Sequence, residues 1–367
     1  QNCYLDKNET ETYFVNLINN NEIDYSRYIF FYINYLIEHN RYNEAKEIAD
    51  QIDTLNSNLL ILQAKSWIDK KYLIVLVGPT ASDKTKLSID IANLYDAEIL
   101  SADSRQFYKE LEVGTAKPNK VELSKAKHHF INNLSIHDNY SVGKYKTEVD
   151  SVLMNYFKKN NYAVLVGGSG LFVDVVCNGI DDIPKVPNEL RNKVREYYKI
   201  NGLNYIQNLL KQYDKKHYNV IDLNNPQRIL RALEVCIYTK KPFSSFLIKK
   251  QQKNNFHLIK IGLNPPREIL YENINSRVDS MIKNGLIDEA LNLVDFKNLN
   301  SLQTVGYKEL FDFFDNKISE KEAIDLIKRN TKKYAKKQMT WFKRDRDIKW
   351  FEKIDNSIFE YVKKIIV

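Results

Sequence analysis

The strongest constraint on the fold comes from residues 72–92, where a buried strand, a glycine loop and a helix follow one another. Residues 73–77 (LIVLV) are apolar at every position, as expected of a strand covered on both faces of a parallel sheet. The next eight residues, GPTASDKT at 78–85, have the spacing of the Walker A pattern, whose backbone N–H groups wrap a phosphate. Residues 86–92 carry apolar side chains at helical spacing, so the positive end of a helix should face the anion.

Within this loop, the pattern predicts that Lys84 neutralises a phosphate and that the hydroxyl of Thr85 holds Mg²⁺. Asp83 stands where the pattern has its second glycine. Its Cβ and carboxylate should crowd the loop, and its charge should repel an anion. The alternative is a loop that joins a strand and a helix by chance. The predicted phosphate-binding residues are Gly78, Pro79, Thr80, Ala81, Ser82, Asp83, Lys84 and Thr85.

Composition limits the class of protein. A chain of 367 residues with 43% hydrophobic and 28% charged residues suits two or three globular domains. The net charge of +8 is compatible with a polyanionic partner, although a general enrichment in Lys has the same effect. The three cysteines form no C-x-x-C pair, which argues against a zinc site and fits a reducing cytoplasm. No apolar run approaches the roughly 18 residues of a membrane span, so we expect no membrane association.

The chain is predicted to have three parts. Residues 1–70 form a helical extension, in which RYNEAK at 41–46 resembles a tetratricopeptide unit and to which no chemistry is assigned. From residue 71, strand and helix signals alternate, which predicts an α/β core with a P-loop NTPase-like parallel sheet flanked by helices. The core comprises residues 71–183 and 255–367. A helical insert at 184–254 begins at the break IPKVP, and beyond the returning strand at 256–263 the chain reads as helical to its end.

Polar residues follow two further predicted strands. The strand at 98–101 ends in ADSRQ, and the strand at 162–166 ends in GGSG. In parallel sheets ligands bind beyond the carboxyl ends of the strands, so these loops and the phosphate loop should meet at one edge.

Residues 328–349 concentrate basic side chains around Tyr334, Trp341 and Phe342. Basic residues interleaved with aromatic ones suit a nucleic-acid backbone with bases available for stacking. A solvated helix face is the alternative. The basic residues are Lys328, Arg329, Lys332, Lys333, Lys336, Lys337, Lys343, Arg344 and Arg346.

Taken together, residues from about 72 to 367 closely resemble the tRNA dimethylallyltransferase family, also called the tRNA isopentenyltransferases. The resemblance implies transfer of a dimethylallyl group from dimethylallyl diphosphate to N6 of the adenosine 3′ of the anticodon, in tRNAs that read codons beginning with U. It also implies that the insert grips the anticodon stem. The matching words are GPTASDKT at 78–85, SADSRQFYKELEVGTAKP at 101–118, LVGGSGLF at 165–172, PQRILRALEV at 226–235, TVGYKEL at 304–310 and KKQMTWFKR at 336–344.

The resemblance also assigns residues. Asp103 is the candidate general base for the exocyclic amine, with a turn or helix cap as the alternative role. Ser169 is expected near the reacting amine. Arg277 is expected at the diphosphate together with residues 78–85, with an ordinary surface arginine as the alternative. The residues expected to meet tRNA are Asp103, Ser104, Arg105, Gln106, Gln227, Arg228 and Arg231, and the basic helix adds Lys336, Lys337 and Lys343.

Two other classes stay open from the residues alone. A P-loop kinase of nucleotides or small molecules would share the first motif and the sheet. A non-catalytic tRNA-binding relative would follow if Asp83 ended diphosphate binding. For the enzyme we expect Mg²⁺ as cofactor, dimethylallyl diphosphate and the tRNA anticodon stem-loop as partners, a monomer, and a cytoplasmic location.

Overall fold

The structure is a computed structural model that describes residues 70–247 and 255–366, together with residues 32, 33, 35, 36, 44, 45 and 48. The extension predicted for residues 1–70 therefore lies almost entirely outside the described residues. The chain divides into two compact units. The larger contains Gln1–Cys177 and Asn254–Val367, and the smaller, Asn178–Lys253, overlaps the insert predicted for 184–254.

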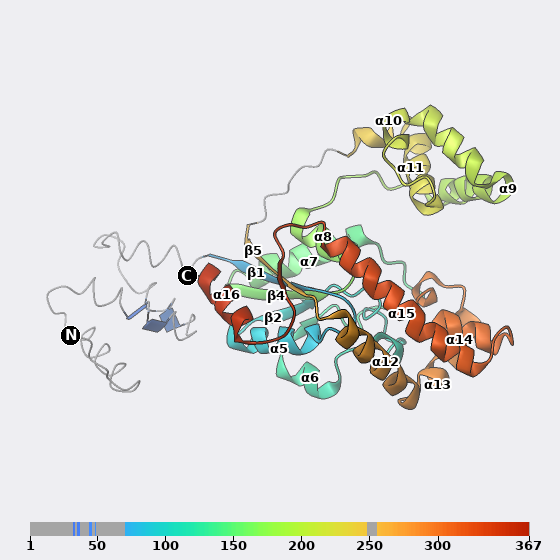
Figure 1. The fold of residues 1–367 in the computed structure, drawn as a ribbon. Coiled ribbons are helices and arrows are strands. Elements are labelled where there is room, and N and C mark those ends of the chain that lie inside the picture. The colour runs from blue at the N-terminus through green and yellow to red at the C-terminus, as the bar shows by residue number, and fades with distance from the viewer. Residues whose placement is uncertain are drawn as a thin grey trace. The chain divides into compact units, whose positions relative to one another are not determined.

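A six-stranded parallel sheet forms the centre of the larger unit, which confirms the predicted fold class (Figure 1). The four strands expected from the sequence are present, and two short strands, β3 and β6, join the sheet at its edges. The helical prediction for the chain beyond residue 263 is wrong at β6, which is too short to show a strand period. The order is β3-β2-β4-β1-β5-β6, with β1 Tyr72–Val77, β2 Glu98–Ser101, β3 His128–His129, β4 Tyr162–Gly167, β5 His257–Leu263 and β6 Lys349–Phe351.

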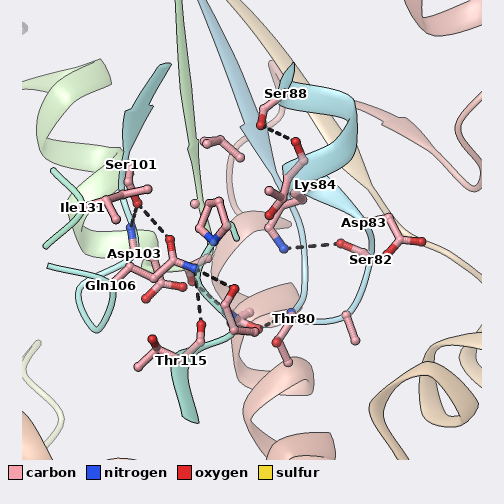
Figure 2. Close-up of a pocket in the computed structure, with 18 of the residues that line it drawn as sticks. Thr80, Ser82, Asp83, Lys84, Ser88, Ser101, Asp103, Gln106, Thr115 and Ile131 are labelled. Carbon is pink, nitrogen blue, oxygen red and sulfur yellow. Dashed lines mark hydrogen bonds between the residues drawn. The ribbon is translucent and has the colours of Figure 1, made fainter. Parts of the chain in front are cut away.

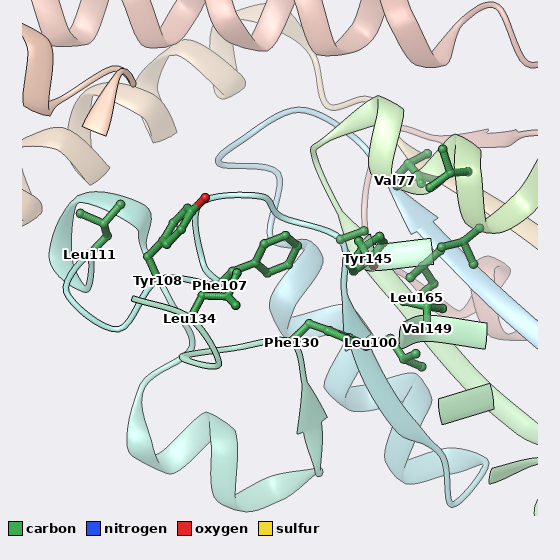
Figure 3. Close-up of a cluster of buried hydrophobic side chains, with 14 of the residues drawn as sticks. Val77, Leu100, Phe107, Tyr108, Leu111, Phe130, Leu134, Tyr145, Val149 and Leu165 are labelled. Atoms are coloured by element: carbon green, nitrogen blue, oxygen red, sulfur yellow. The ribbon is translucent and has the colours of Figure 1, made fainter. Parts of the chain in front are cut away.

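Alternate residues of β1 face opposite sides of the sheet, and every one of them is buried. On one side, Val77 belongs to the cluster drawn in Figure 3, which joins Leu100 and Leu165 to the aromatic ring of Tyr145 from α7. On the other side, Ile74 packs in a second cluster with apolar residues of α5 and α16. Helices therefore cover both faces.

The helices of the larger unit begin and end as follows: α5 Lys84–Leu94, α6 Lys120–Lys125, α7 Val142–Tyr156, α8 Gly170–Asn178, α12 Arg267–Lys283, α13 Leu286–Leu291, α14 Tyr307–Phe314, α15 Glu320–Phe342 and α16 Asn356–Ile366. α8 runs one residue into the smaller unit. Short 3₁₀ turns occur at η2 Val113–Thr115, η4 Val294–Phe296 and η5 Asn300–Leu302. No helix in the described part of the chain is long and apolar enough to cross a membrane.

The smaller unit is helical and has a core of its own. It contains α9 Asn188–Tyr213, α10 Lys215–Tyr218, α11 Pro226–Thr239 and the turn η3 Phe243–Ser245. Leu210 of α9 and Leu233 of α11 are fully buried in this core. α9 is kinked at Gly202, whose φ of 76° interrupts the helix.

The register of the sheet aligns the ends of three strands. Val77 of β1 lies beside Gly167 of β4, and Ser101 of β2 lies beside Val166 of β4. The loops that follow β1, β2 and β4 therefore leave the sheet at one edge, as predicted for parallel strands. Close approach at this edge requires glycine, because a Cβ at Gly167 would lie 2.4 Å from the carbonyl carbon of Ala102.

We therefore expect Gly167→Ala to push the ends of β2 and β4 apart and to lower the free energy of unfolding by about 1–3 kcal/mol, the usual cost of overpacking. Urea denaturation measures this change. Gly143→Ala is the matched control, because its Cβ would meet only the Oγ of Ser141, 3.9 Å away. Equal stabilities of the two variants would contradict the steric argument.

Candidate active site

The phosphate loop joins β1 to α5 and curls through left-handed backbone conformations. Gly78 has a φ of 151°, and a Cβ there would lie 2.7 Å from the carbonyl oxygen of Leu263 in β5, so only glycine fits. Ala81 and Asp83 follow with φ of 62° and 59°. Successive backbone N–H groups in such a curl form a concave site for an anion.

Asp83 adopts the left-handed conformation that the missing glycine would have taken, with ψ of 26°. Its side chain is exposed and points away from the cavity in Figure 2. Asp tolerates this region of φ better than most residues. The crowding predicted for Asp83 is therefore wrong, because the carboxylate leaves the loop on its outer side.

Lys84 points into the cavity that the loop encloses (Figure 2). Its Nζ donates to the carbonyl oxygen of Pro79, and it lies 3.4 Å from the Oγ of Ser82. Burial, together with the charge of Arg277, lowers the pKa of Lys84 to about 7, whereas the negative charges of Asp103 and Asp83 oppose the shift. An anion in the cavity would favour the protonated amine.

Arg277 reaches this cavity from α12, so it is not an ordinary surface arginine. Its Nη1 donates to the Oγ1 of Thr80 across 3.3 Å. Burial lowers the pKa of the guanidinium, and Asp83 and Asp103 oppose this effect. Two cations from different elements, Lys84 and Arg277, thus converge on one small space.

Asp103 follows β2 and lines the same cavity. One carboxylate oxygen, Oδ1, accepts a hydrogen bond from the backbone N–H of Arg105 at 3.0 Å, so the turn-capping role is present. Burial raises the pKa of Asp103, although this hydrogen bond and the charges of Lys84, Arg105 and Arg277 oppose the rise. A carboxylate with a raised pKa is a better proton acceptor than an exposed one.

Ser169 lies in the loop after β4, beside the loop after β2. The backbone N–H of Ser104 donates to the Oγ of Ser169 at 3.0 Å, and the two hydroxyls are 3.1 Å apart. Ser169 lines a larger groove beside the cavity rather than the cavity itself. The geometry therefore puts Asp103 and Ser169 on neighbouring walls.

Arg105 and Gln106 are engaged within the chain. Arg105 donates through Nη1 to the carbonyl oxygens of Asn300 and Ser301, at 3.0 and 2.8 Å. The Nε2 of Gln106 lies 3.3 Å from the carbonyl oxygens of Thr115 and Ala116. Both side chains hold loops around the cavity, and direct contact with tRNA stays a prediction for them.

Gln338 of α15 was not identified from the sequence, yet it joins two loops of the site. Its Oε1 accepts from the N–H of Thr80 at 2.8 Å, and its Nε2 donates to the carbonyl oxygen of Gly168 at 2.9 Å. Tyr334, one helical turn earlier, lines the same cavity as Gln338. Although Tyr334 is 40% exposed, partial removal of its phenol from water, together with the charge of Asp103, raises its pKa to about 12.

The sequence does contain a signal for the face of α15 that carries these residues. Tyr334, Gln338 and Trp341 recur at helical spacing and therefore share one face of α15. Trp341 continues the face, and its Nε1 donates to Asp174 at 2.8 Å. The prediction for this segment used its basic residues, most of which lie on the exposed side of the helix, and overlooked this face.

Three hollows meet at Tyr334. The first, which we call the cradle, has a volume of about 80 Å³ and is lined by the phosphate loop, Asp103, Gln106 and Arg277. The second, the apolar chamber, has a volume of about 100 Å³ and is lined at its inner end by Val278, Met281, Leu286, Val305 and Ile327. The third, the α15 groove, is open, has a volume of about 730 Å³ and includes Ser169, Lys333, Lys337 and Trp341.

The remaining predicted residues lie elsewhere. Gln227 and Arg228 are exposed near the start of α11 in the smaller unit. Arg231 donates to the carbonyl oxygen of Pro184 at 3.3 Å and forms an ion pair with the buried Glu234 at 3.5 Å. On α15, Lys336 and Lys337 are exposed, and Lys343 lies exposed just beyond its end.

Comparisons with known proteins agree with this arrangement. The model of the IPP transferase family matches residues 106–345. A tRNA dimethylallyltransferase from Christiangramia forsetii is 50% identical over 297 residues, which are 80% of this chain and 98% of the relative. Its counterpart from Flavobacterium psychrophilum is 49% identical over 293 residues, which are 78% and 95% of the two chains.

A solved structure of an enzyme of this kind is also similar to this chain. The tRNA isopentenylpyrophosphate transferase from Bacillus halodurans is 33% identical, with a TM-score of 0.59, and the match covers 81% of this chain and 96% of that one. The family model thus spans more than half of the chain, and the relatives are matched over nearly their whole length. The chain belongs to the IPP transferase family, the family of the tRNA dimethylallyltransferases.

Proposed function

We propose that this chain transfers the dimethylallyl group of dimethylallyl diphosphate to N6 of the adenosine immediately 3′ of the anticodon, in tRNAs that read codons beginning with U. One observation carries the proposal. The cationic cradle and the apolar chamber share Thr80, Asp103, Thr115, Ala116, Arg277 and Tyr334 along their walls. A space that is cationic at one end and apolar at the other fits a short prenyl diphosphate.

The diphosphate fits the cradle. Lys84 and Arg277 supply positive charge, the curled loop supplies backbone N–H groups, and the N-terminus of α5 adds its dipole. Negative charge grows on the diphosphate as its bond to the allylic carbon breaks. Lys84 and Arg277, which donate to Pro79 and Thr80 in the structure, would turn to the diphosphate and stabilise that charge.

The adenosine would reach Asp103 from the α15 groove. Chemistry on a base requires that the base leave its stack, and the groove offers Trp341, Lys333 and Lys337 to a base and its phosphates. As the N6–carbon bond forms, the amine must lose a proton. Asp103 lines both the cradle and the chamber, and in this proposal it accepts that proton while Ser169 orients the amine.

Thr85 is the residue that would hold Mg²⁺. The described residues contain no group of three or more His, Cys, Asp or Glu side chains that could bind a metal by themselves. Thr85 lines the cradle, and a single hydroxyl there fits Mg²⁺, which often keeps several waters and binds through substrate phosphates and one or two protein oxygens. Bound there, Mg²⁺ would neutralise charge on the diphosphate.

The kinase alternative gains no support, because the relatives matched over most of the chain are transferases that act on tRNA by name. The non-catalytic alternative rested on Asp83, whose side chain points out of the cradle, although its charge still acts on Lys84 and Arg277. The grip of the smaller unit on the anticodon stem, the monomeric state and the cytoplasmic location stay predictions.

Incubation with labelled dimethylallyl diphosphate, Mg²⁺ and an anticodon stem-loop tests the proposal. Label in the RNA is the expected result, and its absence would contradict the function.

Replacing Asp103 should slow transfer without weakening tRNA binding. We expect Asp103→Ala to lower kcat by roughly 10²–10⁴-fold, the usual contribution of a positioned proton acceptor. Single-turnover kinetics and stem-loop binding measure the two effects. Asp90→Asn, which removes an exposed carboxylate from α5, is the control and should leave both unchanged. An unchanged rate for the Asp103 variant would remove this carboxylate from the mechanism.

The low pKa of Lys84 predicts pH-dependent binding of inorganic pyrophosphate. The empty site loses the charge of Lys84 as pH rises through about 7, so above that pH binding must take up a proton. Affinity should then fall by up to about tenfold per pH unit. Lys84→Arg keeps its charge throughout and should flatten the curve. Since both proteins bind the same ligand, its own ionisation cancels, and parallel curves would refute the assignment.

Basic residues at the end of α15 should contact phosphates rather than read bases. Changing Lys336, Lys337 and Lys343 to Gln should weaken the binding of cognate and non-cognate stem-loops alike. It should also reduce the slope of log affinity against log salt concentration by about 1 per phosphate contact. The control changes Lys349, Lys363 and Lys364, exposed residues of β6 and α16, and removes the same charge. Loss confined to the cognate stem-loop would contradict a phosphate role.

A further inference from the structure

The apolar chamber deepens away from the cradle along two helices. On α12, Arg277 lies at the cationic end and Met281 follows one turn later, about 6 Å further along the axis. On α15, Tyr334 lies at the same end, and Ile327 lies about two turns deeper. α12 and α15 lie side by side (Figure 1).

The size of the chamber suits a short tail. An engineered cavity of about 150 Å³ holds one benzene ring. The chamber, at about 100 Å³, matches a branched five-carbon group and has no room for a ten-carbon geranyl group. Its inner end carries no charged side chain, so a tail placed there would bury apolar surface without desolvating a charge.

The walls of the chamber differ in how firmly they are held. Val278, Leu286 and Ile327 are almost completely buried and form part of the main core. Met281 and Val305, in contrast, are only partly buried, and Met281, the longer of the two side chains, packs against that core from the last turn of α12. Shortening Met281 would therefore open the chamber towards solvent, whereas shortening the three buried residues would leave voids inside the core.

We propose that Met281 is the residue that limits the prenyl tail to five carbons by closing the end of the apolar chamber that lies farther from the cradle. This inference rests on the proposed function. Met is unbranched and flexible, so it can close over a small tail, and shortening it disturbs the core less than shortening the fully buried walls. The cradle thus recognises the diphosphate, and Met281 limits the length of the hydrocarbon tail.

The test compares dimethylallyl and geranyl diphosphates as donors to an anticodon stem-loop, with the full chain. We expect the unaltered protein to use only the first. Met281→Ala should raise kcat/KM for geranyl diphosphate at least tenfold, since one or two carbon positions in an apolar pocket discriminate by about 10–200-fold. Inhibition by inorganic pyrophosphate, which contacts only the cradle, should not change. Met154→Ala, which shortens a methionine that is 69% exposed, is the matched control.

Each outcome bears on a different claim. No transfer from dimethylallyl diphosphate by the unaltered protein would refute the proposed function itself. Normal transfer of that group, with unchanged pyrophosphate inhibition and no gain with geranyl diphosphate in Met281→Ala, would overturn the role of Met281. If Met281→Ala loses pyrophosphate inhibition, the milder Met281→Val replaces it. Met281→Val should raise kcat/KM for geranyl diphosphate by a smaller factor, and an unchanged kcat/KM would likewise overturn the inference.

Discussion

The parallel register of β1, β2 and β4 is the constraint on which the site depends. Val77 lies beside Gly167 and Ser101 beside Val166, so three loops leave the sheet at one edge. Because Gly167 has no side chain, the backbone of Ala102, just before Asp103, can approach β4 closely. Lys84 and Asp103, which belong to different loops, share a cavity because of this alignment.

The amide of Gln338 fixes α15 to that edge. It accepts from the phosphate loop and donates to the loop after β4, and leaving either bond unmade in a buried amide would cost about 1–3 kcal/mol. The helix that carries exposed lysines on one side thereby presents Tyr334 to the cradle on another. One helix thus carries both an exposed basic side and a side that faces the cradle.

Burial sets the chemistry of the charged groups in the cradle. Removal from water lowers the pKa of Lys84 to about 7 and raises the pKa of Asp103, and each group opposes the other's shift. The two charges are therefore interdependent, and a bound diphosphate would alter both. The apolar chamber adjoins this charged region, so one ligand can satisfy the cradle with its head and the chamber with its tail.

From the sequence alone we predicted four of the six strands, the phosphate loop and the meeting of loops at one edge, because apolar runs and glycine spacing are local signals of strands and anion sites. The prediction misjudged Asp83, since the direction of a side chain depends on φ and on its neighbours. It also missed Gln338 and the apolar chamber. Tertiary structure alone decided those features, because Val278, Leu286, Val305 and Ile327 come from separate segments, and only packing turns such ordinary core residues into the walls of one hollow.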